Sequence, residues 1–156
     1  MDSQVAYNVT ARYRRILSYA REEAIRLQSE YIDADHILLG LIREREGLGG
    51  FVIEMMTGDL AGLGAALDQA LRRPEGHAHT TSGMLYTSRA KRVLEHSMAV
   101  ARDLTHAYVN TEHILLGILR DGQSKGAELL VARGVTYDHA RVGVLRLLGS
   151  DHRTMP

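Results

Sequence analysis

The pentapeptide His-Ile-Leu-Leu-Gly occurs twice in this chain, at residues 36–40 and again at residues 113–117. When the sequence is aligned with itself at this offset of 77 residues, 14 of the 40 pairs between residues 10–49 and 87–126 are identical. Several of the other pairs exchange one aliphatic residue for another or one acid for another. Self-similarity at a fixed period indicates a tandem repeat, so we expect the two copies to fold alike.

The repeated pentapeptide is predicted to lie in a short helix at the centre of each repeat. Polar residues precede it, Arg43 or Arg120 follows it, and the positions between are apolar on almost every side. This pattern is typical of a buried helix. Because glycine inside a helix costs about 1 kcal/mol relative to alanine, we interpret Gly40 and Gly117 as positions where another backbone crosses closely.

Each repeat is predicted to contain four helices. Apolar residues recur at three- and four-residue steps after Thr10 and again after Thr87, so both threonines are predicted N-caps. The cap of the central helix is Asp33 or Asp35 in the first copy and Thr111 in the second. No segment predicts a strand. The remaining helices are expected at 51–56 (opened by Gly49-Gly50 and closed by Gly58), 60–71, 126–132 (closed by Gly134) and 137–148 (closed by Gly149).

The segment between the copies, residues 72–86, is rich in Gly, Pro, Ser and Thr and is predicted to be an exposed linker. Repeat one therefore covers about residues 10–71, and repeat two covers about residues 87–149. Neither copy alone is large enough to bury its central helix well. We therefore expect one all-α domain over residues 1–156, and a monomer.

The charge balance argues against two classes of partner. With 19 basic and 19 acidic residues the formal net charge is zero, so neither nucleic acid nor an anionic membrane is an expected partner. The chain has no cysteine, which excludes disulfides, a thiol nucleophile and a thiolate metal site. No N-terminal leader pattern or apolar run of membrane-spanning length is present in the sequence, so we expect a cytoplasmic protein.

The histidines do not predict a metal centre. His77 and His79 lie in the linker, and His36 and His113 begin the central helices without a His-x-x-x-His spacing. At a helix N-terminus the dipole disfavours imidazolium. We therefore expect His36 and His113 to be neutral and hydrogen-bonded locally.

The sequence does not predict an enzyme. It lacks the G-x-x-x-x-G-K-[ST] phosphate loop, the G-x-S-x-G elbow and the H-E-x-x-H zinc motif. The paired acids Glu22/Glu23 and Glu44/Glu46 lie among arginines and are interpreted as solvated faces. We expect no catalytic residues and no cofactor.

Two pairs of polar residues recur at matching positions, Thr10 with Thr87 and Asp35 with Glu112. On a structural interpretation, the threonines cap the first helix of each repeat and the acids complement the dipole of the second. On a functional interpretation, a helix N-terminus can bind an anion and a carboxylate can bind a guanidinium. Together they suit a group with a cationic and an anionic end.

Longer segments resemble a known family. Residues 110–117 read Asn-Thr-Glu-His-Ile-Leu-Leu-Gly, with Arg120 beyond, and residues 86–94 read Tyr-Thr-Ser-Arg-Ala-Lys-Arg-Val-Leu. With the closing Val-Leu-Arg-Leu-Leu-Gly at 144–149, they resemble the double repeat of the Clp AAA+ unfoldase amino-terminal domain, closest to the ClpC branch. The resemblance covers about residues 10–149. It implies two four-helix repeats related by a pseudo-twofold axis, acting as a docking platform for adaptors and substrates of a protease.

In some ClpC-type members, the acid before the His-Ile-Leu-Leu-Gly run and the threonine that opens the first helix are assigned to phosphoarginine recognition. The resemblance therefore implies two ligand sites, Asp35 with Thr10 and Glu112 with Thr87. Asp35 is one methylene shorter than Glu112, and an alanine rather than a threonine precedes it. We therefore expect the second site to bind more tightly.

The leading hypothesis is a non-enzymatic protein-interaction module of the Clp system whose partners are the unfoldase, adaptors or substrates. No ATPase segment follows the repeats in this sequence, so a free-standing accessory protein and the N-domain of a larger unfoldase both stay open. The alternative is a receptor that sequesters peptide-like ligands aimed at the unfoldase, such as cyclic peptides docking near Tyr86 and the linker.

Overall fold

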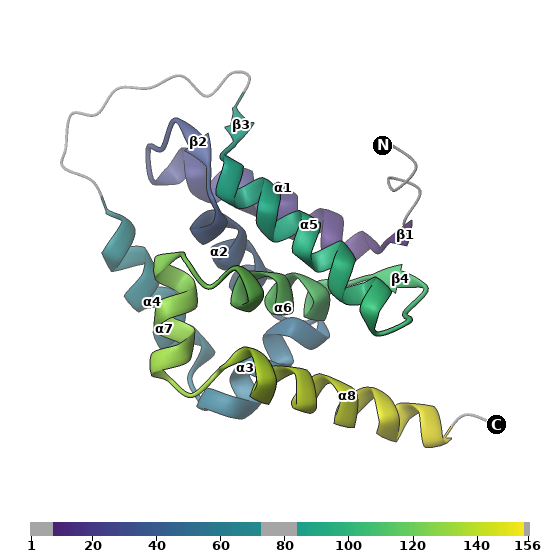
Figure 1. Ribbon diagram of the computed structural model, residues 1–156. Helices are drawn as coiled ribbons and strands as arrows, with labels where there is room; N and C mark the ends of the chain where they lie inside the picture. Colours follow the sequence, from purple (N-terminus) through teal and green to yellow (C-terminus); the bar gives the residue numbers. More distant parts are fainter. Residues whose placement is uncertain (1–7, 73–83, 155–156) are drawn as a thin grey trace.

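The computed structural model describes residues 8–72 and 84–154, with side chains described up to residue 149 (Figure 1). Most of the predicted linker, including His77 and His79, lies outside the described residues. Repeat one contains α1 (Ala11–Arg26), α2 (Ala34–Glu44), α3 (Leu48–Thr57) and α4 (Leu60–Leu71). Repeat two contains α5 (Ser88–Asp103), α6 (Thr111–Asp121), α7 (Lys125–Ala132) and α8 (Tyr137–Thr154).

Four two-residue strands correct the expectation that no strand forms. β1 (Asn8–Val9) pairs in parallel with β4 (Tyr108–Val109), and β2 (Tyr31–Ile32) pairs in parallel with β3 (Leu85–Tyr86). Each pair joins the segment directly before one repeat to a segment within the other repeat. The strands are too short to show the alternating pattern by which a strand is recognised in a sequence.

The two central helices are crossed closely by the first helix of their own repeat. A Cβ atom on Gly40 would lie 2.5 Å from the carbonyl oxygen of Ile16 in α1, and one on Gly117 would lie 2.6 Å from that of Val93 in α5. Both distances are shorter than any side chain tolerates against backbone. The prediction that these glycines allow a close backbone crossing is therefore confirmed.

The two repeats share one core. Figure 1 shows α1 and α5 running side by side, and the hydroxyls of Tyr13 and Ser97 lie 3.0 Å apart between them. Further along the chain the packing crosses between repeats, because α3 packs on α6 and α8 while α4 packs on α7. The buried apolar residues of both halves form a single cluster.

Some helix ends differ from the prediction. α3 begins at Leu48, so Gly49 and Gly50 lie in its first turn instead of before it. Gly49 is needed there because a Cβ would lie 2.7 Å from the carbonyl oxygen of Thr111. α8 continues through Gly149 to Thr154, since an isolated glycine lowers helix stability but does not prevent a helix from continuing. The predicted stops at Gly58 and Gly134 are confirmed, with φ of 70° and 88°.

α3 and α4 are the most apolar pair of consecutive helices. In the described part of the chain, no single helix is long and apolar enough to cross a membrane. α3 and α4 pass that test only when taken together, and they are bent by 97° at the break between them. Their side chains Val52, Ile53, Leu63 and Leu67 are fully buried in the core.

Substitution of either crossing glycine by alanine should destabilise the fold. The added methyl group has to displace backbone, so Gly40→Ala and Gly117→Ala should each lower the free energy of unfolding by about 1–3 kcal/mol, despite the better helix propensity of alanine. Gly149→Ala is the matched control, because nothing lies within 4 Å of the new Cβ, and it should stabilise by up to about 1 kcal/mol. Urea titration followed by circular dichroism measures all three. Equal effects at the three positions would contradict the close crossing.

Candidate functional site

The first candidate junction lies where α5 begins beside α2. The hydroxyl of Thr87 accepts a hydrogen bond from the backbone N–H of Ala90 (3.0 Å) and donates one to the carboxylate of Asp33 (2.7 Å). Asp33 is itself the N-cap of α2. The predicted cap at Thr87 is therefore confirmed, and of the two acids left open for α2, the structure selects Asp33.

The second junction lies where α1 begins beside α6. The hydroxyl of Thr10 accepts from the N–H of Tyr13 (3.1 Å) and donates to the side-chain oxygen of Asn110 (2.7 Å). Asn110 is the N-cap of α6, so the prediction of Thr111 for that position is wrong. The N-cap of α6 therefore lies one position earlier than expected, directly after strand β4.

These contacts pair each threonine with the central helix of the other repeat, not with that of its own repeat as predicted. The sequence grouped Thr10 with Asp35 and Thr87 with Glu112, whereas each threonine is hydrogen-bonded to the first turn of the central helix in the other repeat. The physical cause is the strand pairing, because the N–H of Thr10 bonds the carbonyl of Val109 (3.0 Å) and that of Thr87 bonds the carbonyl of Ile32 (2.9 Å).

The two histidines of the repeated pentapeptide close the capping boxes of α2 and α6. The Nδ1 atom of His36 accepts from the N–H of Asp33 (2.9 Å), and that of His113 accepts from the N–H of Asn110 (2.8 Å). An accepting Nδ1 carries no proton, so both rings are neutral as predicted. Burial, together with the neighbouring His106, lowers the pKa of His113 to about 3.

The Asp35 carboxylate has a structural partner. Its side chain is 6% exposed, and one oxygen accepts from the backbone N–H of Gly126 at 2.7 Å. Gly126 is in the first turn of α7, so Asp35 satisfies an N–H at the start of a helix in the other repeat. Burial raises the pKa of Asp35, while the hydrogen bond from Gly126 acts in the opposite direction.

Glu112 has no such partner. It is 0% exposed, and neither carboxylate oxygen has a hydrogen-bond partner among the residues that the structure describes. At the start of α3, the N–H of Gly49 is bonded instead by the hydroxyl of Thr111 at 2.8 Å. Because Thr111 accepts this hydrogen bond, the Glu112 carboxylate does not bond the start of α3 as Asp35 bonds the start of α7. Burial raises the pKa of Glu112, while its own backbone N–H and the Thr111 side chain act in the opposite direction.

Tyr86, predicted to dock peptide-like ligands, lies in β3 and pairs with Ile32. It is half-buried against the core, and burial raises the pKa of its hydroxyl. It immediately precedes Thr87, so it lies at the first junction. Its neighbour Leu85 is exposed.

One ion pair corrects the prediction for Glu44. Its side chain is buried, and one oxygen lies 2.6 Å from Nη1 of Arg12 while the other accepts from the N–H of Gly47 (3.0 Å). Glu46, its predicted companion on a solvated face, is exposed. Arg12 lies 32 positions earlier in the chain, so local sequence gave no signal of this burial.

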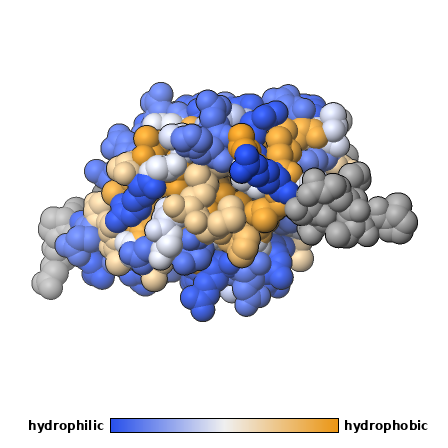
Figure 2. Space-filling view, turned by 90° about the horizontal axis from the view of Figure 1, so that it is seen from below, coloured by the Kyte–Doolittle hydropathy of each residue, from blue (hydrophilic) through white to orange (hydrophobic). Residues whose placement is uncertain are grey.

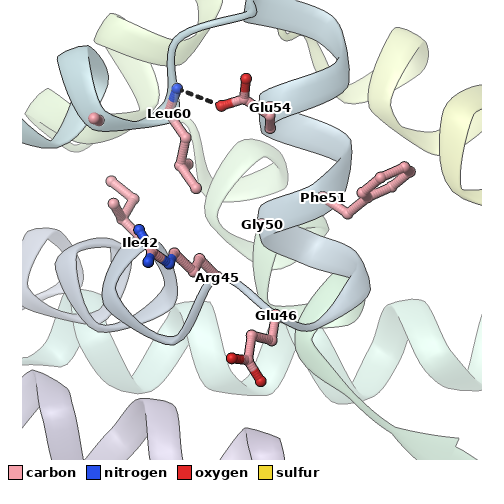
Figure 3. Close-up of a pocket in the computed structure, with 8 residues that line it drawn as sticks. Ile42, Arg45, Glu46, Gly50, Phe51, Glu54 and Leu60 are labelled. Carbon is pink, nitrogen blue, oxygen red and sulfur yellow. Dashed lines mark hydrogen bonds between the residues drawn. The ribbon is translucent and has the colours of Figure 1, made fainter.

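A hollow of about 360 Å³ lies between α2, α3 and α4 (Figure 3). Ile42 and Leu60 line it together with both signs of charge, Arg45 and Glu54. The dashed line in Figure 3 marks the hydrogen bond from the N–H of Leu60 to the carboxylate of Glu54 (2.9 Å). Leu60 is the first residue of α4. In the described ranges, no group of three or more His, Asp or Glu side chains is placed to hold a metal ion.

The unpartnered carboxylate makes stability depend on pH. Above about pH 4.5, the usual pKa, the unfolded chain releases the Glu112 proton while the folded chain retains it, so wild-type stability falls until pH reaches the raised folded pKa. Glu112→Gln removes this loss. We expect the variant to equal the wild type near pH 4 and to exceed it at pH 7, by about 1.4 kcal/mol for each pH unit between the two pKa values. Denaturant titration at several pH values measures the difference.

The control for that comparison is Glu95→Gln, which removes an exposed acid on α5 without touching the core. A stability difference between Glu112→Gln and wild type that stays constant from pH 4 to pH 7 would show that Glu112 ionises as freely in the folded chain as in the unfolded one.

The sequence matches a known family and its members. The model of the Clp repeat (R) N-terminal domain matches residues 8–133. The chain is 41% identical over 142 residues to the negative regulator of genetic competence ClpC/MecB of Bacillus subtilis, and 38% identical over 146 residues to the ATP-dependent Clp protease ATP-binding subunit ClpC of Staphylococcus aureus. Both matches cover 91% of this chain, but the chain spans only 17% of the length of either relative.

Solved structures have the same fold. The Hsp104 N-terminal domain of Candida albicans matches with a TM-score of 0.74 at 17% identity, covering 92% of this chain and 93% of that one. The N-terminal domain of the chaperone ClpD of Arabidopsis thaliana matches with a TM-score of 0.67 at 23% identity, covering 91% and 95%. The expected all-α double repeat is confirmed, and the chain belongs to the family of Clp repeat N-terminal domains.

Proposed function

We propose that this chain is a docking module that receives partner proteins for a Clp-type unfoldase, and that it recognises phosphoarginine side chains at Glu112. The relatives that it matches are named as ClpC proteins and ATP-binding subunits of a protease, and this chain corresponds to a sixth of their length. We assign to this part of the relatives the docking of an adaptor or a substrate, without catalysis.

The observation that carries the finer proposal is the unpartnered carboxylate of Glu112. A buried acceptor without a donor is unfavourable by about 1–3 kcal/mol, and a guanidinium can satisfy both oxygens at once. The phosphoryl group on the same side chain is anionic. The first turns of α1 and α6, beside Thr10 and Asn110, present helix N-termini, which favour an anion.

Access to this carboxylate requires a local rearrangement. Glu112 is fully buried, whereas Thr10 and Asn110 are only partly buried at the adjoining helix ends. The proposal therefore includes separation of the Thr10 and Asn110 side chains, whose single hydrogen bond (2.7 Å) joins α1 to the first turn of α6. Binding then exchanges that hydrogen bond for bonds to the ligand.

The first junction is proposed to be the weaker site for a reason that the sequence did not contain. The Asp35 carboxylate already accepts from Gly126 (2.7 Å), so a guanidinium has to compete with a helix N–H. A hydrogen bond to a charged group is worth about 1.5–3 kcal/mol. Glu112 has no hydrogen bond from the other repeat to lose when it accepts a ligand.

Calorimetry with free phosphoarginine tests the proposal. We expect one dominant site that Glu112→Gln weakens by at least about tenfold, equivalent to 1.4 kcal/mol, because the amide cannot form the charged two-pronged bond. Asp35→Asn is the matched control, because its amide oxygen can still accept from Gly126, and it should leave the affinity nearly unchanged. Affinity should also rise with pH through the raised pKa of Glu112, since the guanidinium binds only the ionised form.

Arginine without the phosphoryl group is the ligand control and should bind far more weakly. Loss of binding in Asp35→Asn but not in Glu112→Gln would reverse the assignment of the site. If phosphoarginine does not bind the wild type, the proposed phosphoarginine site is wrong, and Asp35 and Glu112 have structural roles alone.

A further inference from the structure

A second surface, separate from both junctions, lies along α8. His139, Val142, Gly143, Arg146 and Leu147 all line one hollow of about 550 Å³. Their spacing of three, four, seven and eight residues from the first to the others places them in a single stripe along the helix. At 1.5 Å per residue the stripe is about 12 Å long, or more than two turns. A second stripe on the same helix, containing Ala140 and Val144, is buried in the core.

The opposite wall of this hollow is α3, which contributes Met55 and Met56. Met55 and Val142 in the lining are 50% and 45% exposed, and Phe51, one turn before Met55 on α3, is 51% exposed. Figure 2 views the molecule from the side on which α3 and α8 lie in Figure 1, and it shows apolar side chains gathered across the middle of this face. We call the hollow and its rim the α3–α8 groove.

The floor of the groove is Gly143. A Cβ atom added there would lie 3.8 Å from the terminal methyl of Met55 and 3.9 Å from a methyl of Val52, which are ordinary contact distances. The backbone thus tolerates a side chain at this position, and its absence leaves the groove open. Methionine side chains are flexible and polarisable, and they are over-represented on surfaces that adapt to apolar partners.

The corresponding place on the other side of the pseudo-twofold axis has different chemistry. An offset of 77 residues relates Met55 and Met56 to Ala132 and Arg133. The same offset relates Val142, Gly143 and Leu147 to alanines at 65, 66 and 70. The stripe of α4 therefore has alanines where α8 has Val142 and Leu147, and α7 has Ala132 and Arg133 where α3 has two methionines. Repetition of the fold alone does not explain the groove.

The charges of the groove select its occupant. His139 and Arg146 are the only ionisable residues among those lining it, and in the described part of the chain no carboxylate pairs with the guanidinium of Arg146. An occupant with carboxylates beside its apolar side chains would complement both. A second copy of this chain is disfavoured, because a symmetric contact would bring together two stripes that each carry Arg146 and His139 and no carboxylate.

The walls also select the conformation of the occupant. Both are helices, and their backbone hydrogen bonds are internal, so the groove offers no strand edge to which an extended peptide could add. Recognition must come from side chains, as when the apolar face of an amphipathic helix lies in a groove. We propose that the α3–α8 groove binds an acidic amphipathic helix of a partner protein, with its apolar face on Met55, Met56 and Val142 and its carboxylates toward Arg146 and His139.

Because the partner is unidentified, the probe is a labelled synthetic helix of roughly three turns, with leucines at helical spacing along one face and flanking glutamates. A matched peptide has lysines in place of the glutamates. Methyl NMR of the methionines locates the binding site. We expect the acidic peptide to shift the signals of Met55 and Met56 and to leave that of Met98, which packs on the core in α5, unchanged.

Variants on α8 test the charge argument. Arg146→Glu should weaken the acidic peptide roughly fivefold to tenfold and strengthen the lysine peptide. Arg141→Glu changes the net charge equally on an exposed position outside the groove and should change either affinity by less than about twofold. Gly143→Met, which fills the floor, should prevent binding of both peptides.

The proposal fails if neither peptide shifts Met55 and Met56, if both peptides bind equally, or if the two arginine variants behave alike. Shifts of Met55 and Met56 that grow with protein concentration in the absence of peptide would indicate self-association and would equally overturn it. The result is independent of the Glu112 site, because Arg146→Glu should leave phosphoarginine binding unchanged.

Discussion

The close approach of backbone to backbone at two glycines is the constraint on which the rest of the domain depends. With Gly40 and Gly117 against the carbonyls of Ile16 and Val93, the first and central helices of each repeat lie nearer to one another than side chains on both would allow. Each central helix can then be surrounded on all sides, and its apolar residues are buried with almost no exposure. A methyl group at either crossing would separate the helix pair and, through it, the shared core.

The starts of four helices are determined together at the two junctions. Thr10 and Thr87 cap their own helices and also bond Asn110 and Asp33, the caps of the central helices in the opposite repeat. The neutral histidines complete these caps by accepting backbone N–H groups. At the start of α6 the Glu112 carboxylate has no hydrogen-bond partner among the described residues, and for that reason the phosphoarginine proposal is placed there.

The features that could be predicted from the sequence depend on local spacing or on steric need. The repeat, the packing glycines, the caps at Thr10 and Thr87 and the neutral histidines are of this kind. The strands could not be predicted, because two residues show no alternation. The burial of Glu44 depends on Arg12, and the different fates of Asp35 and Glu112 depend on which N–H of the other repeat each side chain meets. The α3–α8 groove likewise joins segments that are distant in the sequence.

The exchanged contacts at α3 and α7 make each half depend on the other. Thr111 of the second repeat satisfies the N–H of Gly49 in α3, and Asp35 of the first satisfies the N–H of Gly126 in α7. Each half thus supplies the other with a group that starts a helix. Neither half is therefore complete by itself. Without the other half, Gly49 of α3 and Gly126 of α7 would each lose the side-chain acceptor of their N–H group.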